Sequence, residues 1–323
     1  MTTRRYLLPL ALVPATMMLA ACGSDPSSAT TSAEVPSVVT ALYPLAFVAE
    51  RVGGDDISLT NLAAPGVEPH DLELAPQQVG SIVDADLVVY LDGFAPAVDK
   101  AVDQNAADRA FDVGSVITLV EAAGDDGHGH GAEDEQADQE EHSAEEDPDH
   151  ASVDPHFWLD PHLVGELASS LADRLAELDP DHADDFATRA GALIGELDEL
   201  DHAYEAALAT CDTHTLVTAH AAFGYLAARY GLEQFSVAGL EPDAEPSAAR
   251  IAEVQAEIEA EAVTTVYFEP LTSAAVVEAI AGDLGLDTAE LDPIESVDPD
   301  SGDDYLAVMD RNLVALQVGQ GCT

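Results

Sequence analysis

The segment from Pro180 to Ala209 most restricts how this chain can fold. It has no internal proline, and its large apolar side chains recur at roughly helical spacing: Phe186, Leu193, Leu197, Leu200, Tyr204 and Leu208. A single helix over this segment would be about 40 Å long at a rise of 1.5 Å per residue. A helix of that length exceeds one sheet layer, so we expect it to join two lobes.

Short apolar segments alternate with amphipathic ones on both sides of this predicted helix. Before it, we expect strands at 35–43, 57–62 and 87–90 and helices at 44–52, 75–84 and 163–178. After it, we expect strands at 215–219, 233–237, 265–268 and 288–291 and helices at 247–260, 274–285 and 303–318. This alternation predicts an α/β fold with parallel sheets, in which ligands bind at the carboxyl ends of the strands. The N-terminal lobe would span 37–178, the linking helix 180–209 and the C-terminal lobe 211–323.

The chain begins with features of an exported protein. Arg4 and Arg5 precede an apolar run from Tyr6 to Ala21, which is too short for a membrane span and suits a signal peptide. The run closes with Leu-Ala-Ala-Cys22, which resembles a bacterial lipobox. The resemblance implies cleavage after residue 21, a lipid on Cys22 and an anchor on the extracytoplasmic face of the cell membrane. An ordinary secretory signal is the alternative. The composition of residues 22–36 indicates a flexible tether.

The charge of the chain is strongly negative. Sixty-three acidic residues against 10 basic ones give a formal net charge of −53. Repulsion of this size excludes nucleic acid and anionic lipid as partners of the protein surface. A surface adapted to a salty medium would account for most of this charge. A protein that collects cations would carry a similar excess.

Residues 121–152 interrupt the strand–helix pattern. They are dense in Asp and Glu, lack Lys and Arg, and contain His128, His130, His142 and His150. The absence of apolar periodicity predicts a disordered acidic loop. Its histidines, scattered among carboxylates, would hold divalent metal only weakly. A solvated insertion with incidental histidines is the alternative.

The stretch from Asp154 to His162, Asp-Pro-His-Phe-Trp-Leu-Asp-Pro-His, is stiffened by two prolines. Phe157, Trp158 and Leu159 are too apolar for a free loop, so we expect them to be packed. A histidine held by such a segment is pre-positioned, as a metal ligand needs to be. A buried His-Trp corner of an ordinary core is the alternative.

Four polar residues stand out once the predicted strands are placed. His70, His220 and Asp292 each follow a short apolar strand, and His156 lies in the stiffened stretch. They come from both halves of the chain, so they can converge only between the lobes. Three imidazoles and a carboxylate suit a tetrahedral zinc ion.

The motifs that carry these residues resemble those of the zinc-binding solute-binding proteins of ABC importers, a cluster that includes manganese-binding relatives. They are Glu68-Pro-His-Asp71, Asp154-Pro-His-Phe-Trp-Leu159, Thr218-Ala-His-Ala-Ala-Phe-Gly-Tyr225 and Leu291-Asp-Pro-Ile294. The resemblance covers essentially the whole mature chain. It implies two βα lobes joined by one rigid long helix, with a metal in the cleft between them. It also implies that His70, His156, His220 and Asp292 are the ligands, with water or another carboxylate as the alternative at the fourth position. Glu269 and His162 are expected to support the ligands without binding the metal.

The remaining cysteines are expected to form a disulfide. With Cys22 assigned to the lipid, Cys211 and Cys322 are left, and cysteines of an exported protein usually pair. Two free thiols are the alternative. A bridge would pin the C-terminus onto the second lobe.

The sequence favours a monomeric, lipid-anchored receptor, and not an enzyme, that captures Zn²⁺ and passes it to an ABC permease. A manganese-binding protein of the same fold is the first alternative, because such ligand sets can hold Mn²⁺. A zinc hydrolase is less favoured, since a fourth protein ligand would close the position that catalytic water needs. A metal buffer or adhesin working through the acidic loop is the third alternative.

Overall fold

The computed structural model describes residues 35–121 and 153–323. Residues from Val35 to the C-terminus belong to one compact unit. The predicted signal peptide, Cys22, most of the tether and the four loop histidines (His128, His130, His142 and His150) lie outside the described residues. Within 35–121 and 153–323, no helix is both long and apolar enough to cross a membrane.

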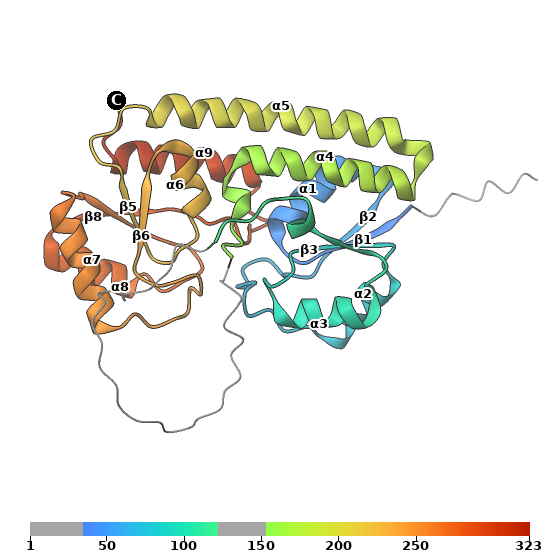
Figure 1. The fold of residues 1–323 in the computed structure, drawn as a ribbon, viewed down its shortest axis with the longest axis horizontal. Helices are drawn as coiled ribbons and strands as arrows, with labels where there is room; N and C mark the ends of the chain where they lie inside the picture. Colours follow the sequence, from blue (N-terminus) through green and yellow to red (C-terminus); the bar gives the residue numbers. More distant parts are fainter. Residues whose placement is uncertain (1–34, 122–152) are drawn as a thin grey trace, which may run out of the picture. The chain divides into compact units, whose positions relative to one another are not determined.

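The first half of the chain forms a four-stranded parallel sheet (Figure 1). The order is β2-β1-β3-β4, with β1 at Ser37–Thr40, β2 at Ser58–Asn61, β3 at Leu87–Tyr90 and β4 at Ala110–Asp112. The helices between them are α1 at Tyr43–Gly53, α2 at Pro76–Asp84 and α3 at Pro96–Asn105. All four residues of the central strand β3 are buried, as its unbroken apolar sequence predicts for a parallel sheet covered on both faces.

The second half repeats this arrangement. Its sheet is also parallel, in the order β6-β5-β7-β8, with β5 at Thr215–Thr218, β6 at Glu233–Ser236, β7 at Thr265–Phe268 and β8 at Asp287–Glu290. The helices are α6 at Gly224–Tyr230, α7 at Ala248–Ala260, α8 at Ala275–Leu284 and α9 at Tyr305–Gly319. The prediction of two parallel α/β lobes is therefore confirmed.

The predicted long helix is present as α5, Ala183–Leu208, and it pairs lengthwise with α4, Pro161–Leu178 (Figure 1). It begins three residues later than expected, because residues 180–182 form a 3₁₀ turn capped by the side chain of Asp179. The predicted apolar face of α5 is buried throughout. This helix contacts α1 of the first half and α6 and α9 of the second, so it joins the two sheets as predicted.

Three elements had not been expected. Helix α3 is polar on average and buries only Val98, Ala101 and Val102, while β4 is three half-buried residues long. Helix α6 is seven residues long and ends at Gly231, whose φ of 72° requires a glycine-like conformation. A helix that is largely polar, like α3, and elements as short as β4 and α6 show little apolar periodicity to read. Ser247 caps the start of α7, because its side chain accepts a hydrogen bond from the amide of Arg250.

The predicted disulfide between Cys211 and Cys322 is confirmed. It joins the residues just after α5 to the end of the chain, across a sequence separation of 111. Hydrogen bonds hold the same tail in place. The amide of Asp212 donates to the carbonyl of Gln320 at 3.0 Å, and the Gln320 amide group donates to the carbonyl of Thr215 at 3.1 Å.

Replacing both cysteines, Cys211→Ala with Cys322→Ala, is expected to lower the free energy of unfolding by about 2–5 kcal/mol. The hydrogen bonds of the tail remain, so the native circular dichroism spectrum should be kept. Denaturant unfolding of the variant and of wild type, each with and without reductant, measures the effect. Reductant should destabilise wild type by a similar amount and leave the variant unchanged. Equal stability of oxidised wild type and the variant would contradict this expectation.

Candidate metal centre

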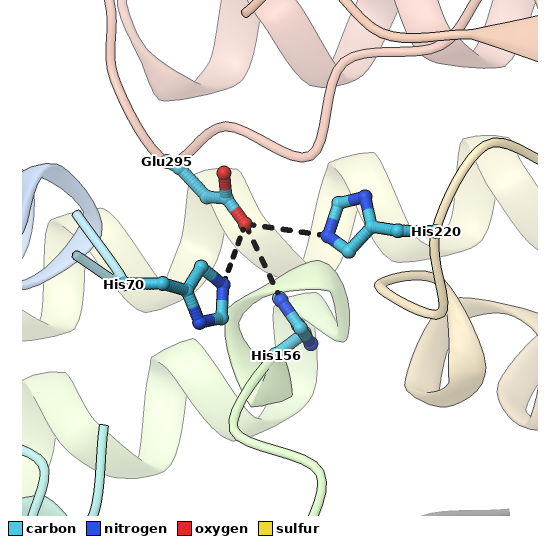
Figure 2. A group of neighbouring side chains, drawn as sticks. All are labelled: His70, His156, His220 and Glu295. Atoms are coloured by element: carbon cyan, nitrogen blue, oxygen red, sulfur yellow. Dashed lines mark hydrogen bonds and ion pairs between the residues drawn. The ribbon is translucent and has the colours of Figure 1, made fainter. Parts of the chain in front are cut away.

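Three histidines and one glutamate converge on one point (Figure 2). One ligand atom from each of His70, His156, His220 and Glu295 lies within 4.8 Å of the others, and all four residues are buried. The Glu295 Oε1 atom lies 3.2 Å from the Nε2 atom of His70, 3.3 Å from that of His156 and 3.5 Å from that of His220. The group therefore offers three nitrogen donors and one carboxylate.

The four residues come from the carboxyl ends of strands in both halves and from the stiffened stretch. His70 lies on the loop after β2, His220 lies two residues after β5, and Glu295 lies on the loop after β8. His156 caps the 3₁₀ turn Phe157–Leu159, which leads into α4. Within this turn Phe157, Trp158 and Leu159 are completely buried, as expected of a packed segment.

Two of the imidazoles are held through their second ring nitrogen. The Asp154 carboxylate accepts from the backbone amide of His156 at 2.9 Å and lies 2.8 Å from its Nδ1. The Glu269 carboxylate accepts from the backbone amide of His220 at 3.1 Å and also bonds its Nδ1. A proton on Nδ1 leaves the lone pair on Nε2, the tautomer that a metal ligand needs.

The Nε2 atoms of His156 and His220 are buried and have no hydrogen-bond partner. A buried polar atom without a partner is costly, so such atoms indicate a group that is bound in the working protein. His70 completes the set from the other side. Its ring packs against Phe94 at 4.4 Å between centroids, and its backbone amide donates to Glu68 at 3.1 Å. Three imidazole nitrogens and one carboxylate oxygen fit a tetrahedral zinc ion.

The carboxylates around the histidines shift their protonation. Burial by itself lowers the pKa of His220, but the carboxylates of Glu269 and Glu295 beside the ring outweigh it and raise the pKa to about 10. Burial likewise opposes protonation of His156, and Asp154 and Glu295 reverse the effect, so its pKa is raised. Burial alone would raise the pKa of Glu295, whereas the three histidines hold it well below its ordinary value. A cation that binds here must therefore displace protons.

Comparison with known proteins places the chain in a family. Residues 38–319 match the family model described as ZnuA, zinc-uptake complex component A, periplasmic.

The chain belongs to the ZnuA family.

Named relatives agree with this assignment. The chain is 34% identical over 288 residues to the zinc-binding lipoprotein AdcA of Streptococcus pneumoniae, covering 87% of this chain and 55% of AdcA. It thus spans about half the length of that relative. It is 32% identical over 314 residues to the high-affinity zinc uptake system protein ZnuA of Bacillus subtilis, covering 93% of each. The solved structure of the laminin-binding protein Lmb of Streptococcus agalactiae has a TM-score of 0.75 and 28% identity, and the match covers 88% of this chain and 99% of Lmb.

In this ZnuA-family chain the fourth member of the group is not the predicted Asp292. The Asp292 carboxylate turns back and accepts a hydrogen bond from the backbone amide of Ile294 at 2.8 Å. Glu295, three residues further on, contributes the carboxylate instead. The prediction took the first acidic residue after the strand. Ile294, which directly precedes Glu295 in the turn after β8, adopts a φ of 61°.

Glu295 was missed because the chain has 63 acidic residues, and one glutamate among them carries no signal of its own. The two residues before Glu295 gave an indication that it is buried. Pro293 and Ile294 are apolar, and an acidic residue that follows a packed apolar pair is a candidate for burial. The structure places Glu295 at 1% exposure.

Of the two expected supporting residues, Glu269 lies against His220 and His162 does not lie against the group. The His162 side chain is 57% exposed, and its Nε2 lies 3.5 Å from Glu166 one turn further along α4. The expectation for His162 is wrong because Asp160 caps α4 by accepting from the His162 amide at 2.9 Å. That cap places His162 in the first turn of the helix, facing solvent.

The start of α6 supports Asp154, which in turn orients His156. The Tyr225 hydroxyl donates to the carbonyl of Asp154 at 2.9 Å and accepts from the amide of Val120 at 2.9 Å. Gly224 leaves room for the Asp154 carboxylate, because a Cβ atom there would lie 2.7 Å from its Oδ2. Asp154 is therefore enclosed by a helix of the second half.

Gly224→Ala is expected to lower zinc affinity by about 10–100-fold, the usual effect of disturbing the partner of a ligating histidine. The added methyl group must displace the Asp154 carboxylate and with it the His156 ring. Gly191→Ala is the matched control, because a Cβ atom at Gly191 in α5 meets nothing within 4 Å. Competition titration with a zinc chelator measures both. Wild-type affinity in the Gly224 variant would show that Asp154 does not need this space.

Proposed function

We propose that this chain is an extracytoplasmic solute-binding protein that captures Zn²⁺ and delivers it to an ABC permease. The observation that carries the proposal is the buried convergence of three imidazole Nε2 atoms and the Glu295 carboxylate. Membership of the ZnuA family supports it. The similarity to AdcA, a zinc-binding lipoprotein, and to the high-affinity zinc uptake protein of Bacillus subtilis supports it further.

The donor set favours zinc over manganese. Zinc accepts a tetrahedral arrangement of imidazole and carboxylate, while manganese prefers oxygen ligands and binds nitrogen sites more weakly. Three of the four donors are imidazole nitrogens. Mn²⁺ therefore remains a second, weaker cargo of the same site.

Capture fits the site better than hydrolysis does. A catalytic zinc keeps three protein ligands and an open position for water. Here Glu295 supplies a fourth donor, and the group is buried. Its ligands also come from loops and turns of both halves, so the site forms without being the core of either sheet. We propose a binding protein and not an enzyme.

The proposal extends to the segments outside the described residues. The lipobox-like Leu-Ala-Ala-Cys22 supports a lipid anchor on the outer face of the cell membrane, with residues 22–36 as the tether. His128, His130, His142 and His150 would gather zinc weakly and feed the buried site. Lmb is a bifunctional protein with adhesin and metal transporting activity, and the similarity raises adhesion as a second activity to be tested.

His220→Ala is expected to lower zinc affinity by more than about 100-fold, beyond the effect of changing a residue that only supports a ligand. The residue is one of four donors, and it does not anchor a hydrophobic core. Circular dichroism of the metal-free variant should therefore match wild type. His162→Ala is the matched control, because that histidine is exposed on α4. The decisive reading is the metal content of the purified proteins together with chelator competition. Tight zinc binding in the His220 variant would refute the assignment.

Zinc affinity is expected to rise with pH through the neutral range. The pKa of His220 is raised to about 10, so this imidazole is protonated at pH 7 before a cation binds. Zinc binds the neutral ring, and each binding event must release that proton. Calorimetric titration in two buffers of different ionisation enthalpy should report at least about one proton released. Binding without proton release would mean that the histidine is already neutral.

A further inference from the structure

The turn that carries Glu295 contains an unusual backbone conformation. Among the described residues, two non-glycine residues have a positive φ, Ala262 at 53° and Ile294 at 61°. For a β-branched residue such as isoleucine this left-handed conformation is unfavourable, and it persists only where the surroundings enforce it. Ile294 directly precedes the carboxylate that faces the three histidines.

The side chain of Asp292 holds the amide of Ile294 from within the turn. Its Oδ1 accepts from the amide of Ile294 at 2.8 Å. Asn312 of α9 fixes the backbone of Asp292 on both sides. Its Oδ1 accepts from the Asp292 amide at 2.9 Å, and its Nδ2 donates to the Asp292 carbonyl at 2.7 Å. The start of the turn therefore has little freedom.

The next residue of the turn is tied to the segment that holds His156. The indole of Trp158 donates to the carbonyl of Pro293 at 2.8 Å, and the carbonyl of Trp158 accepts from the Tyr305 hydroxyl at 2.6 Å. The side chain of Ile294 is completely buried. The turn that carries Glu295 is thus held by hydrogen bonds from α9 and from the 3₁₀ turn beside His156.

We propose that Asp292 is a positioning residue of the metal centre, whose carboxylate oxygen holds Ile294 left-handed and thereby aims Glu295 at the three histidines. The inference rests on the proposed function, in which Glu295 is a ligand. Without the bond from Asp292, Ile294 can return to an ordinary negative φ. That rotation about its N–Cα bond carries the Glu295 carboxylate away from the Nε2 atoms.

Two substitutions at residue 292 separate position from charge. Asp292→Ala removes the acceptor and is expected to lower zinc affinity by about 10–100-fold, as the loss of a supporting contact does. Asp292→Asn keeps an oxygen acceptor for the Ile294 amide and loses only the charge, so it should bind zinc like wild type. If the alanine variant does not fold, Asp292→Ser, with a shorter and weaker acceptor, should bind zinc more weakly than Asp292→Asn.

A double-mutant cycle with Glu295→Gln tests whether residue 292 acts through Glu295. Interaction between the two positions predicts that Asp292→Ala causes no further loss of affinity once Glu295 is changed. A residue that only stabilises the fold would cause the same loss in both backgrounds. The absorption spectrum of bound Co²⁺ gives an independent reading. The Co²⁺ spectrum of Asp292→Ala should resemble the spectrum of Glu295→Gln. The spectrum of Asp292→Asn should resemble the wild-type spectrum.

The outcomes distinguish this inference from the proposed function. If the wild-type protein has no tight zinc site, both the proposed function and the inference about Asp292 are wrong. Tight binding by wild type and equally tight binding by Asp292→Ala would overturn the inference alone. Equal weakening by alanine and asparagine would overturn it as well, since charge and not the turn would then be responsible. An additive cycle would likewise reject it.

Discussion

Each buried imidazole of the metal centre needs a partner for the ring nitrogen that does not face the centre. Without one, the ring has no fixed tautomer and no fixed angle, and a buried polar atom loses its hydrogen bond. Asp154 meets this need for His156, and Glu269 meets it for His220. The geometry of the centre depends on these two contacts, because they fix the rings whose Nε2 atoms face Glu295.

The sheet topology explains how one of these partners reaches its place. Strands β5 and β7 are neighbours in parallel register, with Thr218 beside Tyr267. His220 and Glu269 each lie two residues beyond this pair, so adjacent strands deliver them to the same edge of the sheet. The binding of ligands at the carboxyl ends of parallel strands follows from this alignment. The first sheet has the same strand order and presents His70 after β2 in a comparable way.

The parts of the fold that were predictable are those with a long or repeated signal. Several apolar side chains indicate each of these features. They are the strand–helix alternation, the apolar face of α5 and the packed Phe157–Leu159 turn. The three histidines could be predicted because each lies after a predicted strand or beside prolines. Glu295 was not predicted, because its burial beside the histidines follows from the course of the turn after β8 and not from a repeated pattern of side chains. The prediction that His162 supports the ligands rested on its position in the stretch that holds His156. The hydrogen bond from its amide to Asp160 instead places His162 in the first turn of α4.

The disulfide between Cys211 and Cys322 makes most of the second half a covalent ring. His220 and Glu295 lie inside that ring, whereas His70 and His156 lie outside it. In an unfolded but oxidised chain, the distance between these two inner donors is limited by the ring, and the path through the bridge is shorter than the path along the chain. Bringing them together therefore costs less chain entropy than recruiting the two outer histidines. Two of the four donors thus stay at a raised effective concentration for each other even when the rest of the structure is lost.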